Sequence, residues 1–134
     1  MMGFSTNIEA RTRENSNFRQ VLYTAPHSQL VVMTLRPGED IGMERHERGD
    51  QFIRVESGAG EAIIDGKRYP LSDGVAVVIP EGSEHNITNT SSSAPLRLYT
   101  IYSPPQHEDG TVHRTKQDAA HEHHPAPRRP RVTT

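Results

Sequence analysis

One histidine of the sequence lies in a pattern whose residue types and spacing could do chemistry. His85 belongs to the stretch GVAVVIPEGSEHNITN over Gly74 to Asn89, which reads G-x5-P-x-G-x2-H-x3-N. The β-branched run 75–79 predicts a buried strand, and the Pro-Glu-Gly turn after it predicts a second strand with His85 on its inward face. A histidine mounted on a strand beyond a tight turn is well suited to binding a metal ion.

Two more side chains with metal-binding chemistry lie upstream. Glu44 and His46 are two residues apart, so on a strand both side chains point to the same face. The segment 51–56 alternates between two faces, and Gln51 shares one of them with Ile53. We therefore expect Gln51 to point the same way as the inward residues of its strand.

The stretch around His85 resembles the second conserved motif of the cupin superfamily, in which the histidine binds a metal inside a small β-barrel. The resemblance implies a first motif upstream, ideally G-x5-H-x-H-x3or4-E-x6-G. The segment GEDIGMERHERGDQFIRVESG, from Gly38 to Gly58, keeps both end glycines and one histidine. It departs at two ligand positions, because Glu44 stands in the first His position and Gln51 stands where Glu is usual.

Longer segments extend this resemblance over roughly Asn15 to Lys116. NFRQVLYTAPHSQLVVM, DQFIRVESGAGEAIIDG and LYTIYSPPQHEDGTVHRTK are similar to those of a widespread family of small bacterial single-domain cupins. Such proteins are often labelled as mannose-6-phosphate isomerase-like by fold. The resemblance implies a double-stranded β-helix, the jelly-roll barrel, but a fold does not determine an activity.

The resemblance also implies a set of four metal ligands, namely Glu44, His46, Gln51 and His85. Two imidazole nitrogens, one carboxylate oxygen and one amide oxygen suit a divalent ion, with Mn or Fe favoured over Zn or Ni. A structural zinc site would be closed and would usually use cysteine. In the alternative interpretation, Glu44 and His46 form a hydrogen-bonded polar cluster in a barrel that has lost its metal.

The rest of the interior bears on the substrate. Counting strand parity from the ligands places six residues inward and leaves Arg54 and Arg97 outside. The inward residues are Ile53, Val55, Ile87, Leu96, Leu98 and Tyr102. We therefore expect a mostly apolar pocket that binds a small molecule. A sugar phosphate would call for inward cations, and none is evident on these strands.

Composition excludes several other classes. The 134 residues suffice for one domain, and a net charge of -2 without a basic run through the body argues against nucleic acid. No cysteine is present, which removes disulfides and thiolate metal sites. No stretch has the apolar length to span a membrane, and the N-terminus lacks an apolar signal core. We expect a cytoplasmic protein.

Many short strands separated by turn residues predict an all-β domain. We expect an N-terminal arm at 1–15, loose and ordered only in part, and a cupin barrel at 16–105. A C-terminal extension at 106–120 follows, with at most a short helix near 115–121. The His-, Pro- and Arg-rich tail at 121–134 is predicted to be disordered. His27, in a polar turn, is predicted to be a solvated loop residue rather than a ligand.

Three classes of function remain open. The first is a divalent-metal-dependent enzyme acting on a small organic molecule by dioxygenation, isomerisation or lyase chemistry. The second is a non-catalytic small-molecule-binding or sensor module, and the third is a barrel that serves mainly as a dimerisation scaffold. The outward apolar Phe52 and the unpaired edges of a small jelly roll also predict a homodimer.

Overall fold

The structure is a computed structural model that describes residues 1–121. The described chain forms ten strands and two short helices, as the all-β prediction requires. In order these are α1 (Ile8–Glu14), β1 (Arg19–Thr24), β2 (Gln29–Leu35), β3 (Glu44–Arg45), β4 (Asp50–Ser57), β5 (Gly60–Ile64), β6 (Lys67–Leu71), β7 (Ala76–Ile79), β8 (Glu84–Asn89), β9 (Leu96–Ser103), β10 (Val112–His113) and α2 (Lys116–His121). The disorder predicted for the tail concerns residues that, apart from His121, lie outside the described part.

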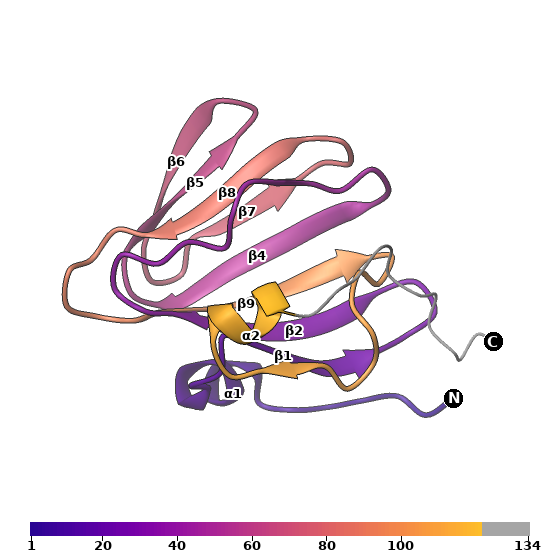
Figure 1. Cartoon of the computed structure of the whole chain (residues 1–134). Helices are drawn as coiled ribbons and strands as arrows, with labels where there is room; N and C mark the ends of the chain where they lie inside the picture. The colour runs from indigo at the N-terminus through magenta and orange to yellow at the C-terminus, as the bar shows by residue number, and fades with distance from the viewer. Residues whose placement is uncertain (122–134) are drawn as a thin grey trace.

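The strands form two antiparallel sheets that face each other (Figure 1). Sheet A has the order β10-β1-β2-β9-β4-β7, and sheet B has the order β3-β8-β5-β6. Consecutive strands in the chain often lie in different sheets, as β4 and β5 do, which is the connectivity of a jelly roll. The double-stranded jelly-roll fold that the sequence predicted is therefore confirmed.

The hydrophobic core fills the space between the sheets, because each strand turns alternate side chains inward. On β9, Leu96, Leu98, Thr100 and Tyr102 are buried, while Arg97, Tyr99 and Ile101 between them are partly exposed. Ile53, Val55 and Ile87 are buried as well, so all six inward assignments are confirmed. Strand alternation counted from the candidate ligands was enough to place them.

The strand β7 differs from the buried strand that the sequence predicted. Its burial alternates, and the Val78 side chain is 62% exposed while Val77 and Ile79 are buried. The reason is that only one face of sheet A meets sheet B, and at the edge position of β7 no neighbouring strand on one side shields the side chains of the outer face. Its outward face therefore meets solvent, although its sequence is uniformly apolar.

The N-terminal segment, predicted as a loose arm, contains a docked helix. The Asn7 side chain caps α1 by accepting a hydrogen bond of 3.0 Å from the backbone N–H of Ala10. Thr12 is fully buried, and Arg13 donates a 2.8 Å hydrogen bond to the carbonyl oxygen of Glu56 on β4. A seven-residue helix is marginal alone, so contacts with distant parts of the chain stabilise it.

The C-terminal extension connects the two sheets. Its strand β10, which comes from the segment Asp109 to His113, pairs with the outer edge of β1 in sheet A. The α2 helix that follows agrees with the expected short helix. Its first residue, Lys116, forms an ion pair with Asp40, and Asp40 in turn accepts a 3.0 Å hydrogen bond from Asn86 on β8. The extension therefore pairs with sheet A and is linked through Asp40 to β8 of sheet B.

Neither helix of the described residues is long and apolar enough to cross a membrane.

Candidate metal centre

Two of the predicted ligands are direct neighbours across a pair of strands. Glu44 on β3 and His85 on β8 are register partners, so their side chains point to the same face. Glu44 Oε1 lies 3.9 Å from His85 Nε2 and 3.6 Å from Nε2 of His46, which follows β3 directly. One ligand atom of each residue lies within 4.8 Å of the others. The structure thus brings three of the four predicted residues together.

The loops that carry these residues are tied to each other. The backbone N–H of Gly82, in the turn before β8, donates a 2.9 Å hydrogen bond to the carbonyl oxygen of His46. The N–H of Gly49 donates to the Glu81 carboxylate at 2.6 Å. Gly49 has a φ of +98°, and a Cβ there would lie 2.3 Å from the Ser103 carbonyl oxygen, so only glycine fits. The two cupin-like motifs therefore hold one another in place.

The fourth predicted residue, Gln51, lies on β4 in sheet A. Its side chain is only 4% exposed and its strand neighbour on β9 is Tyr102. The Tyr102 ring in turn meets the His46 ring edge-on, with 5.8 Å between ring centroids. Gln51 Nε2 donates a 3.0 Å hydrogen bond to Thr100 Oγ1. Gln51 therefore faces the same part of the interior, with its amide orientation set by Thr100.

Three of the four candidate ligands each have a buried side-chain nitrogen or oxygen that makes no hydrogen bond. Among residues 1–121, His46 Nε2, His85 Nε2 and Gln51 Oε1 have no hydrogen-bond partner. The Glu44 carboxylate is near both histidines, but 3.6 Å and 3.9 Å exceed hydrogen-bonding distance. Buried polar atoms are normally satisfied, so this donor set has the chemistry that a divalent cation would complete.

The environment of His85 fixes which of its nitrogens faces the site. Nδ1 lies 3.1 Å from the carbonyl oxygen of Ser83, which can only accept a hydrogen bond, so Nδ1 carries the proton. Burial lowers the pKa of His85 and outweighs the opposing effect of that hydrogen bond. The ring is therefore neutral at pH 7, and the Nε2 lone pair is directed toward Glu44, as metal binding requires.

Glu44 remains an anion in this setting. Burial alone would raise the pKa of its carboxyl group, but His46, Arg19 and His85 act in the opposite direction and the net shift is downward. Tyr102 behaves differently, because burial raises its pKa to about 12. The site thus combines an ionised carboxylate with a phenol that keeps its proton at neutral pH.

Arg19 is an inward cation that sequence reasoning missed, because the search for one covered only the strands of the six inward residues and not β1. It opens β1 and is 6% exposed. Its partner across the strands is Met33, a core residue, so both side chains lie between the sheets. The alternation rule that placed Ile53 would also have indicated that Arg19 points inward, because Arg19 and the buried Val21 share a face of β1.

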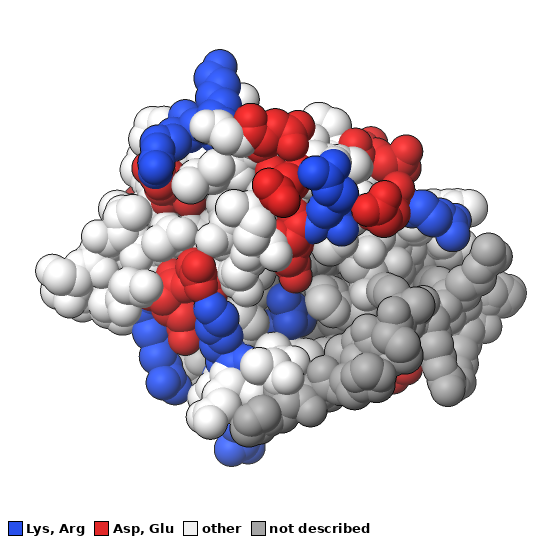
Figure 2. Space-filling model, turned by 45° about the horizontal axis from the view of Figure 1, so that its top comes forward, with Lys and Arg blue, Asp and Glu red and all other residues white. Residues whose placement is uncertain are grey.

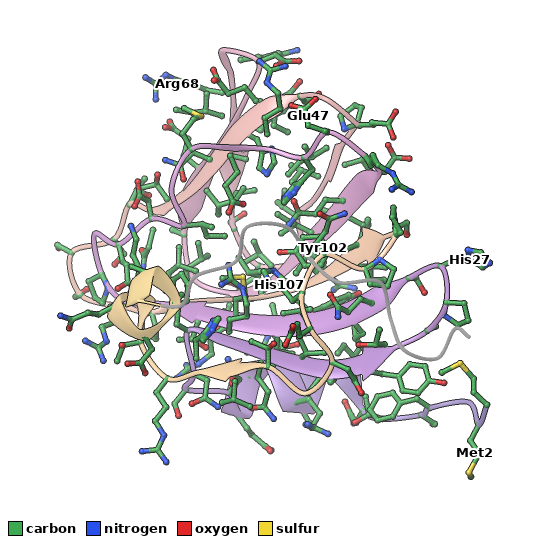
Figure 3. The ribbon with its side chains drawn as sticks, turned by 45° about the vertical axis from the view of Figure 1, so that its right-hand side comes forward. Met2, His27, Glu47, Arg68, Tyr102 and His107 are labelled. Atoms are coloured by element: carbon green, nitrogen blue, oxygen red, sulfur yellow. The ribbon has the colours of Figure 1, made fainter. Side chains whose placement is uncertain are left out.

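Charged side chains of both signs gather around the hollow of the face seen in Figure 2. Tyr102 and His107 point toward one another between the sheets, whereas His27 lies at the periphery (Figure 3). His27 is exposed, in agreement with its prediction as a loop residue. Tyr102 Oη lies 3.4 Å from His107 Nε2, so the C-terminal extension contributes to the interior.

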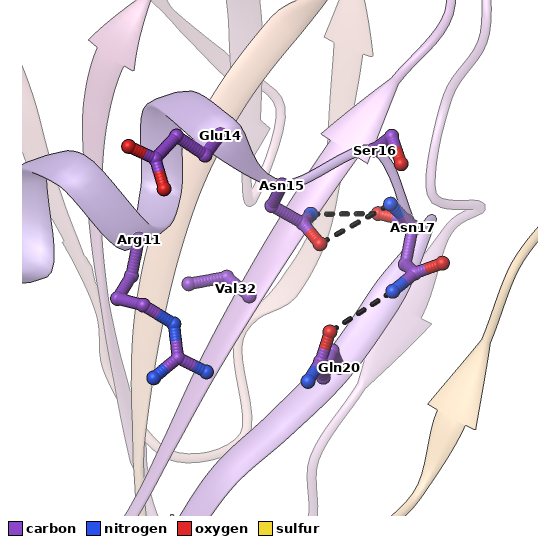
Figure 4. A pocket seen from close by; sticks show the side chains of 7 residues that line it. All are labelled: Arg11, Glu14, Asn15, Ser16, Asn17, Gln20 and Val32. Atoms are coloured by element: carbon purple, nitrogen blue, oxygen red, sulfur yellow. Dashed lines mark hydrogen bonds between the residues drawn. The ribbon is translucent and has the colours of Figure 1, made fainter.

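A different hollow of about 240 Å³ lies between α1 and the start of β1 (Figure 4). Its lining is mostly polar, and its amides bond to each other, since Asn15 accepts from the Asn17 backbone and Asn17 donates to Gln20. Val32 also lines this hollow. On a strand the Val32 side chain points to the opposite face from Met33, and Met33 belongs to the core. The hollow therefore lies on the outer face of sheet A, apart from the candidate ligands.

Comparisons with known proteins agree with this architecture. A family model described as "Cupin domain" matches residues 31–102. An uncharacterized protein of Bacillus subtilis, YrkC, is 44% identical over 87% of this chain, and the match spans 65% of YrkC. An uncharacterized protein of Acanthamoeba polyphaga mimivirus, L612, is 42% identical over 81% of this chain and 70% of that protein. The crystal structure of BH2720 from Bacillus halodurans superposes with a TM-score of 0.87 at 42% identity, covering 90% of this chain and 96% of that one.

Proposed function

This chain belongs to the cupin family, and we propose that its barrel binds one divalent metal ion through Glu44, His46, Gln51 and His85. We further propose that the metal-loaded protein is an enzyme acting on a small organic molecule. Two observations carry the proposal: one ligand atom each of Glu44, His46 and His85 lies within 4.8 Å of the others, and buried atoms of His46, His85 and Gln51 have no hydrogen-bond partner. Each such atom costs about 1–3 kcal/mol when left unsatisfied, and one cation would relieve all three.

The donor set favours Mn or Fe over Zn or Ni. It consists of two imidazole nitrogens, one carboxylate oxygen and one amide oxygen, a hard mixture without sulfur. Protein side chains occupy four positions, which leaves room for a substrate on an ion that prefers six ligands. A divalent ion held there would act as a Lewis acid and polarise a substrate oxygen.

The residues around this centre favour proton-transfer chemistry, as in an isomerase or a lyase, over dioxygenation. Tyr102 keeps its phenolic proton and its ring contacts that of His46, so it can donate to an oxygen on which negative charge develops. Glu44 stays ionised and balances the charge of the cation. The apolar inner residues, such as Ile53 and Ile87, exclude water around the reacting atoms.

The test begins with the metal content of protein purified without added metal. We expect about one equivalent of Mn or Fe per chain, removable by chelator and restored by reconstitution. Loaded and stripped protein should then be screened for turnover of small keto acids, sugars and phenols, with oxygen uptake recorded in parallel. Turnover without oxygen uptake that requires the metal supports the proposal, and oxygen uptake would shift the reaction to dioxygenation.

The same experiment addresses the alternative. Saturable binding of a small molecule with no turnover in either metal state would make the barrel a binding or sensor module. Stability that is unchanged by chelator, in protein that carries no metal as purified, would contradict the proposed metal centre.

A further inference from the structure

Arg19 is the one Lys or Arg side chain of residues 1–121 that is buried. It faces the space between the sheets from the first position of β1. Taking a guanidinium ion out of water is costly unless an anion pairs with it. A buried arginine inside the barrel therefore needs a partner.

The described chain supplies no such anion at bonding distance. Arg19 Nη1 lies 3.4 Å from Nδ1 of His113, and its Cζ lies 5.2 Å from the centre of the Phe18 ring. Its Nε has no hydrogen-bond partner within residues 1–121. No carboxylate of these residues lies within ion-pairing distance of Arg19, and Glu44 attracts it only from further away.

The other groups near Arg19 are suited to an anion as well. The Tyr102 hydroxyl lies within hydrogen-bonding reach of Arg19, and a phenol carries its proton at neutral pH. A phenol O–H beside a guanidinium fork forms a pair of donors. The Tyr102 ring meets the His46 ring with 5.8 Å between centroids, and Glu44 is close enough to Arg19 to be attracted by its charge, so the donors and the candidate metal ligands share one space.

We propose that Arg19, with Tyr102, binds the carboxylate group of a small organic acid whose other end reaches the candidate metal centre. This inference rests on the proposed function and names its substrate class. A single guanidinium matches the single charge and the two oxygens of a carboxylate. A phosphate dianion would call for a second buried cation, and residues 1–121 contain none.

The test measures binding to metal-free protein, so that coordination to a metal cannot account for it. The probes are pyruvate and its uncharged methyl ester. Binding of each probe is measured by calorimetry or by the shift in melting temperature. We expect the protein to bind pyruvate and to ignore the ester. Arg19→Gln should weaken pyruvate binding by about ten- to a hundred-fold, the loss expected for a hydrogen bond to a charged group.

Matched variants keep the test decisive. Tyr102→Phe, which removes only a hydroxyl group, should weaken pyruvate binding by roughly two- to ten-fold. Arg36→Gln makes the same change as Arg19→Gln at an exposed turn residue and should bind pyruvate normally. If Arg19→Gln does not fold, Arg19→Lys and Tyr102→Phe carry the test, because Arg19→Lys keeps the charge but loses the fork.

Three results would overturn the proposal. These are equal pyruvate affinity in Arg19→Gln and the native protein, equal binding of the methyl ester, and binding of inorganic phosphate in place of pyruvate. Metal content is measured separately in each variant. Loss of the metal centre with intact, Arg19-dependent pyruvate binding would reject the proposed function and leave the carboxylate site standing.

Discussion

Gln51 and Thr100 are joined by a hydrogen bond that determines how the Gln51 amide is oriented. Gln51 Nε2 donates to Thr100 Oγ1 at 3.0 Å, and Gln51 Oε1 is left buried and unpartnered. An amide that uses its nitrogen on one side presents its oxygen on the other, and only the oxygen can bind a cation. Thr100 thus acts on the candidate metal centre through Gln51, without belonging to it.

This arrangement predicts that Thr100→Val will weaken metal binding. The substitution keeps the volume but removes the acceptor, so the amide can rotate and present its N–H groups. We expect affinity for Mn²⁺ to fall by about ten-fold or more, as is typical when an outer hydrogen bond to a ligand is lost. Thr100→Ser, which keeps the hydroxyl group, is the control. Equal affinity in both variants, measured by calorimetry, would exclude the orienting role.

Substitution of the ligands themselves should give a graded series. His85→Ala should remove bound metal most completely, because it deletes a nitrogen ligand contributed by β8. Glu44→Ala removes the only anionic ligand, whereas Gln51→Ala should be milder because water can replace a neutral oxygen. The readout is metal per chain by elemental analysis, with His27→Ala, at an exposed loop, as the control. One metal per chain in both His85→Ala and Glu44→Ala would place the ion elsewhere.

The reverse change, Gln51→Glu, should tighten metal binding. It introduces a second negative charge beside the cation, and it restores the residue that the cupin motif usually carries. The added charge should also raise the pKa of any water bound to the ion and so alter reactivity. Weaker binding of Mn²⁺ in this variant than in the native protein would mean that Gln51 is not a ligand.

The sequence predicted correctly those features of the site that depend on neighbouring residues in one strand, and it missed those that depend on contacts between distant parts of the chain. Alternation within a strand placed Ile53 and Ile87 correctly, because the pleat fixes side-chain direction. The exposure of Val78 could not be predicted in the same way, since it depends on which face of sheet A is left uncovered and on β7 being an edge strand. The α1 helix escaped prediction because its stability comes from distant contacts such as Arg13 with Glu56. Arg19 was missed because arginine is usually exposed.

A homodimer remains a prediction, and the outer face of sheet A is the surface we propose for it. Phe52 and Tyr99 lie there with ring centroids 6.2 Å apart, and Val78 is exposed on the neighbouring edge strand. A second copy of the chain would cover this apolar face and the unpaired edge. Light scattering at micromolar concentration should give twice the chain mass, and Val78→Lys should give a monomer.

The control for that measurement is Val112→Lys. Val112 is also exposed, but it lies on β10 at the opposite edge of sheet A. The dimer should survive this change. A monomeric native protein would contradict the prediction, and a dimer lost equally in both variants would place the interface elsewhere.

The contact between Lys116 and Asp40 predicts how acid affects the attachment of the C-terminal extension. Hydrogen bonds from Asn86 and then Lys116 lower the pKa of Asp40 below its ordinary value of 3.8. A carboxyl group whose pKa is lower in the folded state contributes stability above pH 3.8, and that contribution is lost as the pH falls through the folded-state pKa. Asp40→Asn should therefore lower the free energy of unfolding at pH 7, by at most about 1 kcal/mol for so exposed a pair.

The decisive measurement is an NMR titration of the Asp40 carboxyl carbon. Its midpoint should lie below 3.8 in the native protein and move upward in Lys116→Met, because one of the two lowering partners is gone. Lys67→Met removes an exposed lysine from β6 and should leave the midpoint unchanged. A midpoint that is the same in Lys116→Met and the native protein would show that Lys116 does not hold Asp40 in solution, and that the extension is not fastened to sheet B at this point.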